Sequence, residues 1–190
     1  MIVLLVLLVI LIAAAVVLTA VYNGLVSKQV NVDNAWSQID VQLKRRHDLI
    51  PNLVETVKGY AAHEKEVLER VIQARNTAIA ASGAAGTKEQ AQAENMLTGA
   101  LRQIFALAEN YPNLKANQNF LQLQEEIAST ENRISFARQF YNDAVALFNS
   151  AIRQVPGNLV AGFGNFKPRE FFELGADEAT AVNTPPKVSF

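Results

Sequence analysis

The sequence predicts an all-α, membrane-anchored protein in which one transmembrane helix is followed by a bundle of long helices. Three observations support this fold class. Residues Ile2–Val21 carry no charge, and apolar residues recur every three or four positions from Val32 to Val155. Nothing in that second region alternates with the period of two that a half-buried strand requires. We therefore expect no sheet in the core.

The N-terminal stretch has the length and composition of a membrane anchor. Its twenty residues would span ~30 Å as a helix, the thickness of the hydrocarbon core of a bilayer. Tyr22 follows as an interfacial aromatic residue, and Lys28 is the first charged side chain. A cleavable signal with its cleavage site at Ala13–Ala15 is disfavoured, because no basic segment precedes the apolar run and the run continues beyond these alanines. We expect residues 1–27 to form an uncleaved anchor with a short juxtamembrane segment.

Composition narrows the classes of partner. About 160 of the 190 residues lie outside the anchor, which suits one domain. Seventeen basic residues balance eighteen acidic ones, so no basic face for nucleic acid is implied. The absence of cysteine excludes disulfides, thiolate metal sites and lipoprotein anchoring.

The first soluble region carries one apolar stripe that runs past Pro51. Its members are spaced by three or four residues, as on a helix that buries one face. Either Pro51 kinks a continuous helix, or Asp48 caps a new helix with Pro51 in its first turn. The stripe consists of Val32, Trp36, Ile39, Leu43, Ile50, Val54, Val57, Ala61, Leu68, Val71 and Ile79.

Two more helices are expected after a connector at residues 82–86. Thr87 and Gln90 form a capping box for the first of them, which buries Leu97, Leu101, Ile104, Ala108 and Tyr111. Pro112 ends that helix, and Asn113 can cap a long one reaching Val155. The long helix carries a stripe that Phe136, Phe140 and Leu147 widen, so we expect it to meet more than one neighbour. The stripe consists of Phe120, Leu123, Ile127, Thr130, Ile134, Ala137, Tyr141, Ala144, Phe148, Ile152 and Val155.

The helical region predicted to form the bundle covers residues 28–155, and Pro156-Gly157 stops its last helix. Residues 156–174 are rich in phenylalanine and glycine and are expected to fold back over the bundle, with docking into a partner or the membrane interface as the alternative. Residues 175–190 are expected to be extended or disordered.

No catalytic, cofactor-binding or metal-binding residue is predicted. His63-Glu64 opens like a zinc-protease motif, but Val67 stands where the second histidine would be required. His47 and His63 are therefore interpreted as surface histidines. Gly162-Phe163-Gly164 follows no predicted strand, so we interpret it as an ordinary connecting loop rather than a nucleotide-binding loop. An enzyme is the least favoured function.

Two polar clusters have alternative readings. Lys44-Arg45-Arg46 could touch acidic lipid headgroups, but we favour a solvated face that pairs with Asp40, Asp48 or neighbouring helices. A second set either forms a buried or inter-subunit network that fixes helix register, or makes ordinary exposed pairs. That set is Glu131, Asn132, Arg133, Arg138, Asn142 and Asp143.

Several stretches together resemble the LemA family of bacterial membrane proteins, and they cover nearly the whole chain in order. They are residues 22–26, 35–36, 39–46, 48–54, 57–60, 108–112, 130–134 and 137–142. The resemblance implies one anchor helix followed by an antiparallel up-and-down four-helix bundle, and it implies no enzyme activity. Some members take part in forming magnetosome membranes, which suggests membrane organisation.

The favoured function is a non-enzymatic scaffold that self-associates as a homo-oligomer and organises or shapes the bacterial membrane. The alternative is an adaptor that recruits another membrane protein, such as a protease or sensor. We expect a single-pass protein of the cytoplasmic (inner) membrane. Lys28 and Lys44-Arg45-Arg46 follow the anchor, so the positive-inside rule favours a cytoplasmic helical domain, with the periplasmic side as the alternative.

Overall fold

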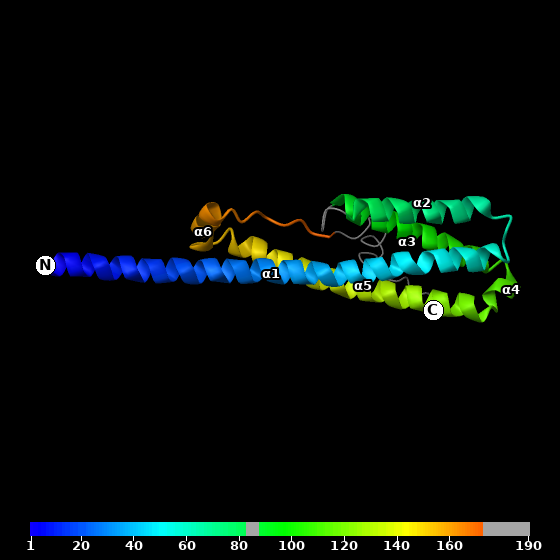
Figure 1. Ribbon diagram of the computed structural model, residues 1–190, viewed down its shortest axis with the longest axis horizontal. Helices are drawn as coiled ribbons and strands as arrows, with labels where there is room; N and C mark the ends of the chain where they lie inside the picture. Colours follow the sequence, from blue (N-terminus) through cyan, green and yellow to red (C-terminus); the bar gives the residue numbers. More distant parts are fainter. Residues whose placement is uncertain (83–87, 173–190) are drawn as a thin grey trace, which may run out of the picture.

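The computed structural model describes residues 1–82 and 88–172, and every regular element within these ranges is a helix (Figure 1). The all-α prediction is therefore confirmed for the described residues. The elements are α1 (Ile2–Lys58), α2 (Lys65–Ala81), α3 (Lys88–Ala108), α4 (Pro112–Lys115), α5 (Gln118–Ala151) and α6 (Gly157–Gly164). Thr87 of the expected capping box and the expected tail at 175–190 lie outside the described residues.

The anchor and the first soluble helix form one continuous helix. α1 has 57 residues, and its first part extends alone beyond the rest of the protein (Figure 1). All side chains from Ile2 to Ala20 are exposed, and Leu25 is the first buried residue. Among the described residues, α1 is the one helix that is long and apolar enough to cross a membrane. The long apolar N-terminal helix is thus confirmed.

Pro51 lies inside α1 and does not start a new helix. Proline has no N–H to donate to the carbonyl four residues before it, which here is the carbonyl of His47. Arg75 of α2 supplies the missing donor, with 2.7 Å between its Nε and the carbonyl oxygen of His47. The chain turns instead at residues 59–64, so the expectation that one stripe continues through this region was wrong.

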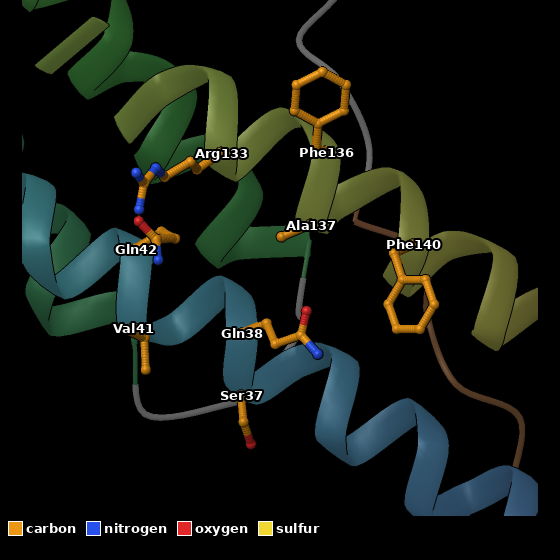
Figure 2. A pocket seen from close by; sticks show the side chains of 8 residues that line it. All are labelled: Ser37, Gln38, Val41, Gln42, Arg133, Phe136, Ala137 and Phe140. Atoms are coloured by element: carbon orange, nitrogen blue, oxygen red, sulfur yellow. The ribbon is translucent and has the colours of Figure 1, made fainter. Parts of the chain in front are cut away.

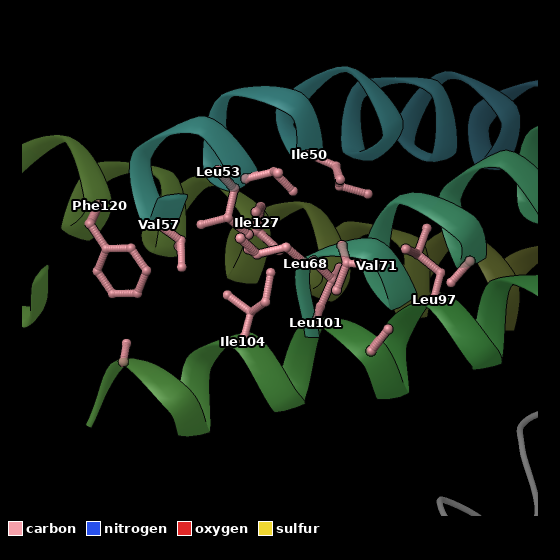
Figure 3. Close-up of a cluster of buried hydrophobic side chains, with 14 of the residues drawn as sticks. Ile50, Leu53, Val57, Leu68, Val71, Leu97, Leu101, Ile104, Phe120 and Ile127 are labelled. Carbon is pink, nitrogen blue, oxygen red and sulfur yellow. The ribbon is translucent and has the colours of Figure 1, made fainter. Parts of the chain in front are cut away.

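The half of the molecule far from the anchor has a core to which four long helices contribute (Figure 3). The largest side chains come from α1, α2, α3 and α5, and α4 adds Leu114. Most of the predicted stripe is buried here, while Ile79 is exposed and the neighbouring Ala78 is buried instead. The labelled members in Figure 3 are Ile50, Leu53, Val57, Leu68, Val71, Leu97, Leu101, Ile104, Phe120 and Ile127.

The half near the anchor is built differently. Here α1 and α5 pack along each other, and the chain after α5 covers one side of this pair. Trp36 of α1 makes edge-on ring contacts with Tyr141 of α5 and with Phe172, each with 5.4 Å between ring centroids. α2 and α3 lie beside the far half (Figure 1). An antiparallel four-helix arrangement throughout residues 28–155 stays a prediction.

Two asparagines of α5 fix the segment that follows α6. The side chain of Asn149 donates to the carbonyl of Arg169 and accepts from its N–H, both at 2.9 Å. Asn142 makes the same pair of bonds with the backbone of Phe172, at 3.1 and 2.9 Å. An amide side chain offers both N–H donors and an acceptor oxygen, so it can pair with the N–H and the carbonyl of one backbone residue as a neighbouring strand would.

The boundaries of the last long helix differ from those expected. Asn117, not Asn113, caps α5 by accepting a hydrogen bond from the N–H of Phe120 at 3.0 Å. The helix ends at Ala151, and Val155 is exposed rather than buried. Pro112 begins the short α4 because proline is well suited to the first turn of a helix.

Candidate interaction surface

A buried ion network joins three helices in the middle of the bundle. Arg46 of α1 is 1 % exposed and forms ion pairs with Glu94 of α3 and Glu131 of α5. The Arg46 guanidinium also donates to the hydroxyl of Thr98 at 3.0 Å. These contacts use Nη1 and Nη2 of Arg46, and a planar guanidinium suits such a position because it offers several donors in a fixed geometry. Arg46 pairs with neighbouring helices, as expected, but the expectation that it lies on a solvated face was wrong; Lys44 and Arg45 are exposed.

His47 belongs to the same network, so its interpretation as a surface histidine was wrong. It is 7 % exposed, and its Nε2 lies 3.0 Å from Oε1 of Glu94. Burial alone raises the pKa of the Glu94 carboxyl, but the hydrogen bond with His47 and the charge of Arg46 outweigh this and lower it below its ordinary value. Glu94 is therefore held as a carboxylate. His63 is exposed, as expected.

The second polar set divides between buried and exposed positions. Glu131 joins the ion network, Asn142 fixes the chain at Phe172, and the buried Arg138 lies over the Phe172 ring at 5.4 Å. The remaining three, Asn132, Arg133 and Asp143, are exposed.

The partner of Arg46 was missed at the sequence level, although a signal was present. Arg46 lies between Leu43 and Ile50 on the α1 stripe, and Glu94 lies three residues before Leu97 on the α3 stripe. Each charge thus occupies a core position at helical spacing, which indicates a buried pair.

An open apolar groove lies between α1 and α5 in the half near the anchor (Figure 2). Val41, Phe136 and Phe140 are 62 %, 74 % and 54 % exposed. Figure 2 shows both phenylalanines projecting outward from α5. The groove is lined by Ser37, Gln38, Val41, Gln42, Arg133, Phe136, Ala137 and Phe140.

The expectation that α5 meets more than one neighbour is confirmed. α5 packs along α1, and its Phe120 contacts Phe105 of α3. Phe136, Phe140 and the 62 %-exposed Leu147, which widen the stripe, are exposed nevertheless, because α2 and α3 lie in the half of the molecule far from the anchor (Figure 1). Exposed apolar side chains gathered on one face are typical of an interaction surface.

The face of α1 that lines the groove continues toward the membrane with small residues. Steps of three and four residues back from Val41 lead through Gln38, Asn34 and Asn31 to Ser27, Gly24 and Ala20. A Cβ placed on Gly24 would meet no atom within 4 Å. The groove and this part of the anchor therefore form one open face along a single helix.

The phenylalanines after α5 divide between packing and exposure. Phe166 contacts the rings of Tyr22 and Phe148, and Phe172 is 1 % exposed. Phe163 is 95 % exposed at the end of α6, where Gly162-Phe163-Gly164 forms the last helical residues. Within the described residues, no group of three or more histidine or acidic side chains is placed to hold a metal ion.

The fold and these surfaces define a membrane-associated, all-helical protein. Comparison with known families gives its class: the model of the LemA family matches residues 35–190. The chain belongs to the LemA family, as the sequence resemblance indicated.

Individual relatives extend the match to most of the chain. Protein LemA of Metamycoplasma hominis is 31 % identical over 164 residues, covering 85 % of this chain and 73 % of that protein. A magnetosome protein MamQ of Paramagnetospirillum magneticum is 25 % identical over 187 residues, covering 86 % and 69 %. MamQ of Magnetospirillum gryphiswaldense is 24 % identical over 188 residues, with the same coverage.

Proposed function

We propose that this protein is a non-enzymatic scaffold that self-associates through the α1/α5 groove and thereby organises or shapes the bacterial membrane. The observation that carries the proposal is the exposure of Val41, Phe136 and Phe140 around one open groove in the half of the molecule near the anchor. Covering an apolar surface of this kind releases water and is favourable in proportion to the area removed from it.

A second copy of the same chain is the occupant that the geometry favours. Every copy enters the bilayer through the same end of α1, so the copies stand parallel and hold the groove at the same height. Apolar groove then meets apolar groove, as a symmetric interface requires. Confinement to the bilayer also raises the effective concentration of one copy near another.

The anchor adds contact area below the groove. Ala20, Gly24 and Ser27 lie on the groove side of α1, and small residues allow two helices to approach closely in lipid. A standard interface buries ~800 Å² per partner, more than three exposed side chains provide. We therefore expect the anchor and the groove to act together, and we expect homo-oligomers that require both.

Two of the relatives are named as magnetosome proteins, and this name applies to them and not to the present chain. For this chain we propose a single-pass protein of the cytoplasmic membrane with the helical domain in the cytoplasm. The remaining proposals are the absence of a nucleic-acid partner and the antiparallel four-helix arrangement of residues 28–155.

The test compares wild-type full-length protein in mild detergent with one groove variant and one control variant. In Phe136→Ser/Phe140→Ser the apolar face is removed, and the particle mass measured by light scattering should fall from a multiple of 20.8 kDa to one chain. Leu121→Ser is the matched control, because Leu121 is an exposed apolar residue of α5 outside the groove. It should leave the mass unchanged.

A second variant tests the anchor without touching the folded domain. Gly24→Leu adds bulk where no neighbouring atom lies within 4 Å, so helix content should persist while association weakens. A wild-type protein that is monomeric at every concentration would overturn self-association. A defined complex with a different membrane protein, lost in Phe136→Ser/Phe140→Ser, would replace the scaffold with the adaptor function.

A further inference from the structure

We infer that α6 is a second membrane-contact element, which lies in the headgroup region of an anionic bilayer and directs Leu159 and Phe163 toward the acyl chains. This surface lies on a different face of α1 from the groove proposed for self-association. The inference therefore does not depend on that function.

The depth of α6 follows from its position along α1. The apolar run of α1 extends to Val21, and α6 lies beside the end of that run rather than beyond it. Leu18, Thr19 and Tyr22 line an open hollow together with Val160 and Phe163 of α6. If residues 2–21 cross the hydrocarbon core, α6 is at the level of its boundary with the headgroups.

The outer face of α6 is apolar and uncovered. Leu159 and Phe163 are four residues apart, so they project from the same side of the helix, and they are 60 % and 95 % exposed. Val155, just before α6, is 78 % exposed. The opposite side of α6 packs inward, with Val160 and Ala161 each 7 % exposed. An apolar face in water is costly, whereas the same face in a membrane interface is favourable.

The packing around α6 holds this face outward. Gly164 is so close to the Phe166 ring that an added Cβ would lie 2.5 Å from it. Phe166 in turn contacts Tyr22 of α1, with 5.6 Å between ring centroids. Asn165 reverses the chain in the left-handed conformation, with φ 53°. Phe166 therefore occupies the position next to Tyr22, and Phe163 remains almost fully exposed at the edge of the hollow.

The charges near α6 match an anionic lipid surface. Lys28 follows Tyr22 by six residues on α1, and Arg153 and Lys167 flank α6 in the chain; these three are the side-chain charges in residues 1–32 and 144–168. No acidic residue occurs in either range. The first carboxylate, Asp33, is already paired with Arg169 at 2.8 Å. Unopposed basic side chains next to an apolar face favour anionic headgroups.

The absence of cysteine allows a direct test on the full-length protein. Phe163→Cys and Leu159→Cys are labelled with a nitroxide and reconstituted in bilayer nanodiscs of phosphatidylcholine and phosphatidylglycerol. Collision rates with oxygen, which concentrates in lipid, and with a water-soluble nickel chelate are then measured. Leu121→Cys on the far part of α5 is the control.

The expected result is loss of nickel accessibility and gain of oxygen accessibility at positions 159 and 163, with the opposite at position 121. Equal nickel accessibility at all three positions would overturn the inference. A second copy covering α6 would also exclude nickel, so the measurement is repeated with Phe136→Ser/Phe140→Ser and at one protein per nanodisc. If positions 159 and 163 become accessible to nickel under these conditions, a second copy rather than lipid covers α6, and the inference is overturned.

The charge argument has its own measurement. In Lys28→Gln/Arg153→Gln/Lys167→Gln, protection at position 163 should no longer depend on phosphatidylglycerol, whereas in the parent it should increase with that lipid. An identical response of both proteins would contradict recognition of anionic headgroups. Lys65→Gln/Lys115→Gln, two basic residues far from the anchor, is the matched control.

Discussion

Arg75 donates a hydrogen bond at 2.7 Å to the backbone carbonyl of His47, the acceptor that Pro51 leaves without its helical partner. An interior proline costs a helix ~3 kcal/mol or more, partly through this unpaired carbonyl. The contact from α2 recovers part of that cost. It also ties α2 to α1 at the one position of the α1 backbone where proline has removed the helical donor.

Removing Arg75 should therefore destabilise the protein more when Pro51 is present than when it is replaced. We expect Arg75→Met to lower the free energy of unfolding by about 1–3 kcal/mol, since the carbonyl of His47 loses its donor. In a Pro51→Ala background the new N–H can bond to that carbonyl, and the cost should fall by about 1 kcal/mol. Urea unfolding followed by helical circular dichroism in detergent measures both values.

The control for this cycle is Arg70→Met, because Arg70 forms an exposed pair with Glu66 on α2. Its cost should be under about 1 kcal/mol in either background. If Arg75→Met lowers the free energy of unfolding equally with proline and with alanine at position 51, Arg75 does not compensate for the helical hydrogen bond that Pro51 removes.

The buried pair of Arg46 and Glu94 should respond to single and double substitution differently. Arg46→Met alone leaves the 2 %-exposed Glu94 without its cation and should cost about 3–5 kcal/mol. Arg46→Met/Glu94→Met removes both charges and should be closer to the wild type. Arg45→Met tests a 50 %-exposed arginine and should cost at most about 1 kcal/mol. A double variant less stable than Arg46→Met would refute this account.

Stability should decrease in acid through Glu94. Its pKa in the folded protein lies below the ordinary value of 4.5, so its contribution is complete above pH 4.5 and is lost as the pH falls through the lower folded value. The groups that face it are Arg46 and His47. Below pH 4.5 the free energy of unfolding should fall more steeply for wild type than for Glu94→Gln. Glu89→Gln, an exposed residue of α3, should keep the wild-type slope.

The two asparagines of α5 should control the segment that ends at Phe172. In Asn149→Leu the backbone N–H and carbonyl of Arg169 lose their partners, and in Asn142→Leu those of Phe172 do. Amide hydrogen exchange in residues 165–172 should become faster while exchange in α2 and α3 stays the same. Asn132→Leu, an exposed asparagine of the same helix, is the control. Unchanged exchange in all three variants would mean that ring packing alone holds the segment.

Local pattern was sufficient to predict the helices and the anchor. Leu97, Leu101 and Ile104 follow helical spacing, and all three are buried as that spacing predicts. The unbroken apolar run from Ile2 likewise needs no knowledge of the rest of the chain. The turn at 59–64 was missed because Pro51 gave a stronger local signal for a break than Gly59 did.

The tertiary structure decided which chain segments meet. Arg46 and Glu94 are 48 residues apart. The apolar stripe of each helix predicts which face is buried, but it does not predict which other helix packs against that face. α3 packs against the far half of α5, where Phe105 contacts Phe120, whereas Phe136 and Phe140 in the other half remain exposed although their spacing fits a core position. The anchor, the helices and their buried stripes could be predicted from local sequence, because these depend on neighbours within a few residues. Packing between distant segments fixes which helices contact each other, leaves the groove open and places α6 along α1. This packing is specified only in the folded chain.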